Sequence, residues 1–334
     1  MSVTSSEQLA GLLVAVITGG RPLLKERPTH RYLDALTDLG VHDTVWVVAD
    51  ADADSYEPDG HDLAVYPRAW AEEWAADHWM LPTPPEQGGF LGAFPGREWA
   101  CREAERRGCW GVLQLDDNIR RLTAVRGNGF SARLVERRGG LGLFADLLAA
   151  VTLSTNSRMT GAGLGANPNL KPSERKVANA GFPYSLFIER VGAGREPWYG
   201  PFEDDITHAL QYGGRADGAT AALMQVLTYE KESKSKSGMR SAYNHERSVQ
   251  LQRIFPESAK VGVRKTTANG RGTARVFHTM LRGAIRNPLA VHDPDLFAAA
   301  KAQLVDIAAE WHTEFLTANR EKAARRTRSA GRTT

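Results

Sequence analysis

The sequence has little cysteine and no long apolar run. Its two cysteines, Cys101 and Cys109, fall in a predicted helix and in the strand that follows it. We interpret both as free, buried thiols of a protein in the reducing cytoplasm. The early apolar run Leu12–Ile17 spans six residues and follows a start without positive charge. It is too short for a signal peptide or a membrane span, so we expect no membrane partner.

Positive charge is missing from one part of the chain and gathered in another. Residues 41–62 hold seven carboxylates and no lysine or arginine, whereas residues 231–275 hold eleven lysines and arginines against three glutamates. From Ala318 onward, six basic residues stand against one acid. A basic C-terminal half suggests a polyanionic partner such as a nucleic acid. A merely solvated basic surface is the alternative.

The hydrophobic pattern predicts an α/β protein. The chain of 334 residues is 42% hydrophobic and 24% charged, as in ordinary globular proteins. Two strands, Leu12–Ile17 and Thr44–Ala49, flank a helix around His30–Leu39 and predict a parallel βαβ unit. Residues 82–96 are rich in proline and glycine and predict a loop. The glycines of residues 161–165 lack phosphate-loop spacing. Further strands are expected at Leu113–Leu115, Ser185–Glu189, Met224–Tyr229 and Ala274–Thr279, and further helices at Arg97–Arg107, Leu141–Thr155 and Pro294–Leu316.

These elements imply one large domain with an appendage. We expect a mixed, mostly parallel sheet flanked by helices over residues 10–283. A C-terminal helical segment is expected at 284–320 and a basic disordered tail at 321–334.

The strand at 113–115 runs straight into Asp116, Asp117 and Asn118. Ligands of open α/β sheets gather at the carboxyl ends of strands, so these side chains would face one. Adjacent carboxylates repel each other, and a divalent cation relieves that repulsion. We therefore expect a site for Mg²⁺ or Mn²⁺ and a sugar nucleotide. Turn or helix-cap aspartates are the alternative.

A second acidic cluster, Glu203, Asp204 and Asp205, stands where a helix is expected to begin. A favourable interaction with the helix N-terminus would explain it without any chemistry. Crowded carboxylates also raise one another's proton affinity, which makes a general base. Transfer of a group from a phosphate to a hydroxyl needs both a cation and a base, and the two clusters can divide these roles. His278 would be a further metal ligand, and His208 would at best contact a residue of the site without binding the ligand itself.

These motifs, in this order, resemble the GT-A class of nucleotide-sugar glycosyltransferases. The resemblance implies a GT-A-like fold in which Asp116 faces the ribose or donor sugar and Asp117 or Asn118 faces the metal. It implies Asp204 as the base of inverting transfer, with Glu203 and Asp205 beside it. Asn118 departs from the family pattern, which usually has an aspartate there. The nucleotide would be bound by Thr18, Gly19, Gly20, Arg21, Asp50 and Arg97.

Within that class the chain looks most like the TET/JBP-associated glycosyltransferases of bacteriophages and kinetoplastids. This implies a UDP-sugar donor and, as acceptor, a hydroxymethylated pyrimidine in DNA, bound by the basic 231–275 segment and the tail. The base would be flipped out and stacked near Trp198, Tyr199 and Phe202. A phage enzyme would act in the cytoplasm of its bacterial host. Three alternatives remain: a small-molecule, protein or glycan acceptor; a nucleotidyltransferase; and a DNA-binding protein without enzymatic activity.

Overall fold

The computed structural model describes residues 7–37, 41, 43–57, 59–124, 140–165, 177–232, 244–266 and 273–330. The main sheet is made of β1 (Leu12–Ile17), β2 (Thr44–Ala49), β3 (Asp62–Tyr66), β4 (Gly111–Asp116), β5 (Ile119–Ala124), β6 (Ser157–Leu164), β7 (Asn179–Ala180), β8 (Leu186–Arg190) and β9 (Thr220–Lys231).

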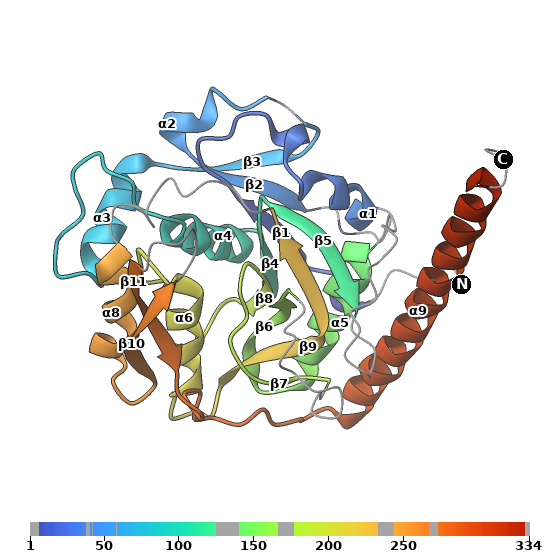
Figure 1. Cartoon of the computed structure of the whole chain (residues 1–334). Helices are drawn as coiled ribbons and strands as arrows, with labels where there is room; N and C mark the ends of the chain where they lie inside the picture. Colours follow the sequence, from blue (N-terminus) through green and yellow to red (C-terminus); the bar gives the residue numbers. More distant parts are fainter. Residues whose placement is uncertain are drawn as a thin grey trace.

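The strand order is β3-β2-β1-β4-β8-β6-β9-β5, and β7 pairs with β9 (Figure 1). Strands β1, β2, β3, β4, β6 and β9 run in one direction, and β5, β7 and β8 run against them. The expected mixed, mostly parallel sheet is therefore confirmed.

Strand β1 lies inside the sheet and is buried on both faces. Successive residues enter two separate cores, Leu12 and Val14 on one face and Leu13 and Ala15 on the other. This is the two-residue alternation of an extended chain, and apolar residues on both faces are typical of parallel strands covered by helices. Parallel pairing of β1 with β2 confirms the predicted parallel pair of strands.

Helices cover both faces of the sheet. The described helices of the chain are η1 (Glu7–Leu9), η2 (Leu24–Glu26), η3 (His30–Tyr32), α1 (Asp34–Thr37), α2 (Asp50–Ala53), α3 (Arg68–His78), α4 (Phe94–Arg106), α5 (Gly140–Ser154), α6 (Asp204–Gly213), α8 (Asn244–Ile254) and α9 (Pro294–Ala330), where η marks a short 3-10 helix. Phe94 of α4 and Ala209 of α6 pack on one face, and Phe144 and Leu147 of α5 pack on the other. Within the described residues, no helix is both long and apolar enough to cross a membrane.

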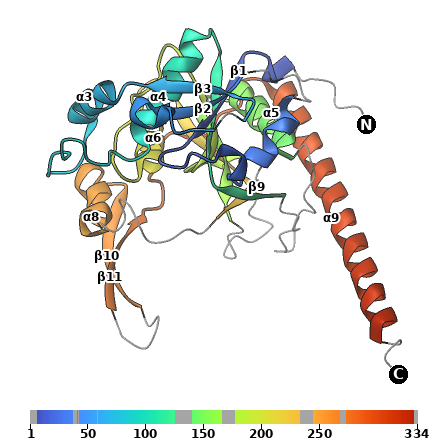
Figure 2. The ribbon, with the colours of Figure 1, turned by 90° about the horizontal axis from the view of Figure 1, so that it is seen from above.

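Two elements extend from this body. Strands β10 (Ala259–Thr266) and β11 (Thr273–Met280) form an antiparallel pair, and α9 begins against α5, where Ala300 and Leu304 are buried. Figure 2 shows the β10–β11 pair and the far end of α9 projecting on opposite sides of the body.

Three local expectations need correction. Instead of one helix over 30–39, the chain forms η3 and α1, and residues 38–40 lie outside the described part. Helix α4 begins at Phe94, inside the expected loop, because the following proline suits a first helical turn. Helix α9 continues to Ala330 where a disordered tail was expected. Its end is rich in alanine, arginine and lysine, which favour helices, and the positive charge suits a helix C-terminus.

Candidate active site

A cavity of about 910 Å³ lies at the edge of the sheet where β1 and β4 end. Three segments meet in it: the loop Thr18–Arg21 after β1, an acidic turn (Asp116–Asn118) after β4, and a helix-start cluster (Glu203–Asp205) at the beginning of α6. His278 of β11 also lines the cavity. Neighbouring parallel strands end at the same edge of a sheet, which explains why the loop after β1 and the acidic turn at the end of β4 come together.

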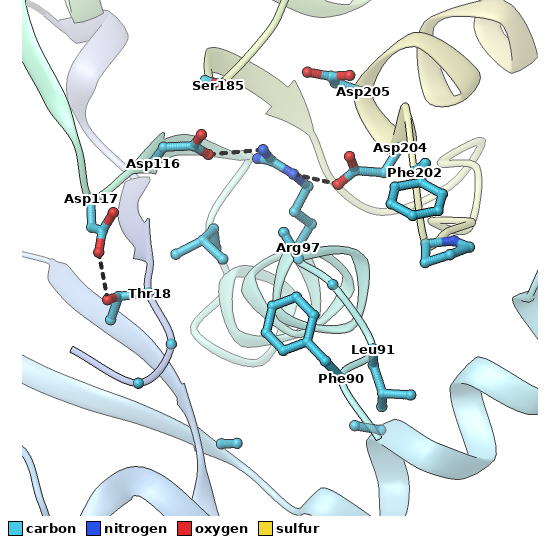
Figure 3. Close-up of a pocket in the computed structure, with 18 of the residues that line it drawn as sticks. Thr18, Phe90, Leu91, Arg97, Asp116, Asp117, Ser185, Phe202, Asp204 and Asp205 are labelled. Atoms are coloured by element: carbon cyan, nitrogen blue, oxygen red, sulfur yellow. Dashed lines mark hydrogen bonds and ion pairs between the residues drawn. The ribbon is translucent and has the colours of Figure 1, made fainter. Parts of the chain in front are cut away.

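A buried arginine, Arg97 of α4, joins the two acidic groups (Figure 3). Its Nη2 donates to Asp116 Oδ1 at 2.9 Å and its Nε donates to Asp204 Oδ2 at 2.9 Å. Its side chain is only 3% exposed. Burial alone would lower the pKa of Arg97, but the two carboxylates outweigh it and raise that pKa, so the guanidinium stays charged.

Both carboxylates of the acidic turn are matched by positive charge. Asp116 pairs with Lys231 of β9 as well as with the guanidinium, and Asp117 pairs with Arg21. Thr18 Oγ1 donates a further hydrogen bond of 2.8 Å to Asp117 Oδ2. Burial acts to raise the pKa of Asp116, but the nearby lysine and arginine hold it well below its usual value. Asp116 is therefore ionised at any pH near neutrality.

The acidic turn is held in place by one threonine. Thr29 Oγ1 donates to the carbonyl of Asp116 at 2.6 Å and accepts from the Ile119 N–H at 2.9 Å. Its own N–H donates to the carbonyl of Asp117 at 3.4 Å. A hydroxyl that donates and accepts at once can replace the backbone bonds that a short connection between two strands leaves unmade.

The acidic turn fits a divalent cation in part. Asn118 Oδ1 is buried and has no hydrogen-bond partner in the described part of the chain, and an amide oxygen beside two carboxylates suits Mg²⁺ or Mn²⁺. However, across the described ranges, Asp116, Asp117 and His278 do not bring three ligand atoms within reach of one ion. These residues suit an ion held by one or two oxygens of the turn and completed by substrate phosphates and water. His278 lines the cavity without joining such a group.

The helix-start cluster has a different electrostatic balance. Glu203 has a left-handed backbone, with φ of 49°, and Asp204 and Asp205 fill the first turn of α6. Asp204 is paired with Arg97, whereas Asp205 makes no ion pair within the described residues. Burial, then the charge of Asp204, raises the pKa of the Asp205 carboxyl well above its usual value. A carboxyl that holds its proton more tightly is the stronger base once it is ionised.

Asp50 does not line the cavity, although we expected it to face the nucleotide. Its Oδ1 accepts hydrogen bonds from the N–H groups of Ala51, at 2.7 Å, and Arg68, at 2.8 Å. It thus satisfies the first N–H of α3, whose preceding residue, Pro67, provides no side-chain cap. Asp52 and Arg68 line the cavity instead.

The sequence reasoning missed several lining residues. Lys231 was counted only as part of a basic segment, and its pairing with Asp116 depends on the position of β9 in the sheet. Ser185, whose Oγ accepts from Lys231 Nζ at 2.9 Å, gave no signal. Phe90, in the glycine-rich loop 88–92, is 65% exposed and lines the cavity. A large apolar residue inside a glycine-rich loop is the sequence feature that could have indicated its position at the cavity.

Behind the cavity lies a buried polar network around Glu189. His208 Nε2 lies 2.6 Å from Glu189 Oε1, and Trp198 Nε1 donates to Oε2 at 3.0 Å. Tyr212 also donates to this carboxylate, at 2.8 Å. Trp198 is fully buried and stacked on His208, so it is a core residue. Of the three aromatics expected near a flipped base, only Phe202 lines the cavity.

A scan against known protein families and a search of curated proteins found no match for this chain. Among solved structures it is similar to the glucosyl-3-phosphoglycerate synthase of Mycobacterium tuberculosis in complex with Mg²⁺ and UDP, with a TM-score of 0.43 and 11% identity over 81% of this chain and 89% of that one. The same enzyme with Mn²⁺, UDP-glucose and phosphoglyceric acid gives a TM-score of 0.40 and 12% identity over 74% and 80%. Similarity at this level assigns neither a substrate nor a residue role, and the resemblance to TET/JBP-associated enzymes stays an expectation.

Proposed function

We propose that this protein is a glycosyltransferase that moves a sugar from a nucleotide-sugar, such as a UDP-sugar, to a hydroxyl group with inversion. The observation that carries the proposal is the pairing of two unlike acidic groups across Arg97 in one cavity. The acidic turn is anionic and suited to a cation beside a diphosphate. The helix-start cluster contains a carboxyl with raised proton affinity, which suits a general base.

In this proposal the donor nucleotide binds against the loop after β1. A Cβ added at Gly19 or Gly20 would meet no protein atom within 4 Å, and Gly20 has a φ of +62°. These glycines therefore leave the cavity open for a ligand to approach the backbone closely. Arg21 and Arg68, which also line the cavity, supply positive charge for the phosphates.

A divalent cation, Mn²⁺ or Mg²⁺, would be held by Asp117 and Asn118, with Asp116 beside them. Asp117 accepts one hydrogen bond at each oxygen, and each carboxylate oxygen keeps a further lone pair. When bound, such an ion neutralises charge on the leaving diphosphate.

The proton of the acceptor hydroxyl is taken by Asp205. As its carboxylate removes that proton, the hydroxyl oxygen bonds to the anomeric carbon of the sugar. The bond from that carbon to the diphosphate breaks, and the diphosphate leaves with the electron pair. The resemblance implied Asp204 as base, but its pairing with Arg97 supports a positioning role and leaves Asp205 for proton transfer.

The acceptor we propose is a hydroxymethylated pyrimidine in DNA. The basic 231–275 segment includes α8, β10 and the start of β11, and the later part of β11 brings His278 to the cavity. Residues 233–243 and 267–272 lie outside the described part. The exposed ring of Phe90 at the cavity offers a surface on which a flipped base can stack. Lysines and arginines of the segment and of α9 would contact phosphates.

The proposal is tested with Mn²⁺, a panel of nucleotide-sugars and three acceptor pools. The pools are DNA with hydroxymethylated pyrimidines, the same DNA unmodified, and a mixture of small molecules, proteins and glycans. The expected product is a nucleoside heavier by one sugar residue, found by mass spectrometry only with the first pool and not with the Asp205→Asn variant.

Each other outcome separates an alternative. Transfer only to the third pool would overturn the DNA acceptor and keep the glycosyltransferase. Release of pyrophosphate from a nucleoside triphosphate would indicate a nucleotidyltransferase. Salt-sensitive retention on DNA that tolerates Asp116→Ala, without any turnover, would indicate a DNA-binding protein.

A further inference from the structure

Two histidines and an aspartate meet at half-buried positions outside the cavity. His30 begins η3, and Asp59 and His61 lie in the connection between α2 and β3. One ligand atom from each of the three lies within 4.8 Å of the other two. The two imidazole rings are arranged edge to face, with centroids 5.9 Å apart. None of the three lines the cavity, so this group is separate from the site of the proposed transfer.

One histidine nitrogen in this group has no hydrogen bond. His30 Nε2 is buried without a hydrogen-bond partner among the described residues, although Asp59 Oδ2 lies 3.2 Å away. Two ligands bound at about 2.0–2.2 Å to a tetrahedral ion are separated by about 3.3–3.6 Å. The spacing of these two atoms is therefore close to that of ligands sharing an ion, while their orientation does not make a hydrogen bond.

The carboxylate is held in orientation from behind. Asp59 Oδ2 accepts from Trp46 Nε1 at 2.8 Å, and Oδ1 accepts from the His61 N–H at 3.0 Å. Trp46 is fully buried in β2, so it anchors the carboxylate to the sheet. Ligating carboxylates in metal sites are commonly fixed by such hydrogen bonds.

We propose that His30, Asp59 and His61 bind a divalent transition-metal ion of the Zn²⁺ class. Two imidazoles and a carboxylate suit Zn²⁺ and related ions better than Mg²⁺, and water completes the coordination. A simple His30–Asp59 ion pair would account for the 3.2 Å spacing but leave both the second histidine and the missing hydrogen bond at His30 Nε2 unexplained. The ion accounts for both.

The ion has a structural role, because it fastens the segment that positions the acidic turn. His30 directly follows Thr29, the residue that hydrogen-bonds to both sides of that turn. Asp59 and His61 belong to the connection that follows α2. Cross-linking these two segments restricts the position of Thr29. This inference does not depend on the proposed glycosyl transfer, and its test uses binding and stability.

The test starts from protein stripped with a chelator and dialysed. Zn²⁺ bound per chain is measured by equilibrium dialysis and elemental analysis, and Co²⁺ is added as a spectroscopic probe. We expect one tightly bound ion, a Co²⁺ spectrum with nitrogen ligands, and a rise in Tm on the order of 5 °C at a hundredfold excess of Zn²⁺ over its Kd. His61→Gln and His30→Gln should each weaken binding at least tenfold and abolish the rise.

Two controls locate the ion. His292→Gln removes a histidine far from the group along the chain, and Asp117→Asn alters the acidic turn; both should keep the Zn²⁺ stoichiometry and the Tm rise. Asp59→Asn removes the carboxylate ligand but keeps an oxygen that can accept from Trp46. This variant should therefore stay folded and lose tight Zn²⁺ binding, which separates loss of a ligand from a folding defect. Absence of tight Zn²⁺ binding by the wild type, or equal binding by all the histidine variants, would overturn the proposal.

Discussion

The acidic turn and the helix-start cluster contain the same kind of residue, yet they differ in charge. Each carboxylate of the turn lies against a cation, with Asp116 between Arg97 and Lys231 and Asp117 beside Arg21. In the helix-start cluster the guanidinium pairs with Asp204, and at Asp205 burial and the charge of Asp204 outweigh the lowering effect of Arg97 on the pKa. The pKa values of Asp116 and Asp205 are shifted in opposite directions as a result. Whether a carboxyl in such a cluster is suited to hold a cation or to accept a proton depends on its burial and on which basic side chains lie beside it.

The largest effect is expected from Asp205→Asn, which removes the proposed base and keeps the shape of the side chain. We expect kcat to fall by about 10²–10⁴-fold with donor affinity unchanged, because proton removal from the acceptor is lost. Turnover with each nucleotide-sugar and calorimetric binding of UDP measure the two quantities. Asp204→Asn is the matched control and should retain more activity. The reverse ranking would transfer the role of base to Asp204.

Arg97→Met breaks the link between the two groups. It leaves the partly buried Asp204 without a counter-charge and Asp116 with Lys231 alone, and we expect the free energy of unfolding to fall by about 3–5 kcal/mol. Urea unfolding at neutral pH measures this. Arg106→Met, at an exposed position of the same helix, should leave the free energy of unfolding nearly unchanged. Similar losses for the two variants would mean that the bridge adds little.

Asp117→Asn tests the other side of the comparison. We expect the affinity for UDP in the presence of Mn²⁺ to fall by at least about tenfold, because one oxygen donor for the cation becomes weaker. The fall should be smaller when Mn²⁺ is removed with a chelator, and calorimetry under both conditions shows the difference. An equal loss with and without the ion would assign Asp117 to the fold instead of the cation.

The two groups should also respond to pH in opposite senses. The pKa of Asp205 is raised in the folded protein, so its contribution to stability is complete below its ordinary value of 3.8 and is lost as the pH rises through the folded value. The pKa of Asp116 is lowered, so its contribution is present above 3.8 and is lost as the pH falls.

Asp205→Asn should therefore raise Tm by a few degrees at alkaline pH and have little effect in acid. Asp116→Asn should lower Tm at neutral pH by an amount that shrinks toward acid. Thermal unfolding across the pH range gives both curves. If the change in Tm depended on pH in the same way for both variants, the opposite directions of the two pKa shifts would be contradicted.

That the acidic turn and the helix-start cluster lie together was predictable from the sequence, but the directions of their pKa shifts were not. A strand that ends in carboxylates and a helix that begins with them point to one edge of an α/β sheet, and both segments do line one cavity. The low pKa of Asp116 depends in part on Lys231, which lies 115 residues away in the sequence and reaches Asp116 through the order of the strands. Long-range pairing of this kind leaves no local pattern.

The connections between elements were the least predictable part. Asp50 and Asp52 are two aspartates of one short acidic segment after β2, and nothing in their spacing tells them apart. In the structure Asp50 accepts a hydrogen bond from the first N–H of α3, whereas Asp52 lines the cavity. The choice follows from the position of the first residue of α3 beside the start of α2, which only the folded chain determines.

The smallest expected effect on stability comes from comparing Asp50 with Asp52. Asp50→Ala removes the acceptor of the Arg68 N–H at an exposed position, and water replaces much of it, so we expect a loss of about 0.5–1 kcal/mol in the free energy of unfolding. Donor affinity should not change. Asp52→Ala, two residues away, should leave stability almost unaltered and change the affinity for UDP, because its side chain lies at the cavity. Urea unfolding and calorimetry on both variants make the comparison, and an effect of Asp50→Ala on UDP affinity would return that residue to the nucleotide site.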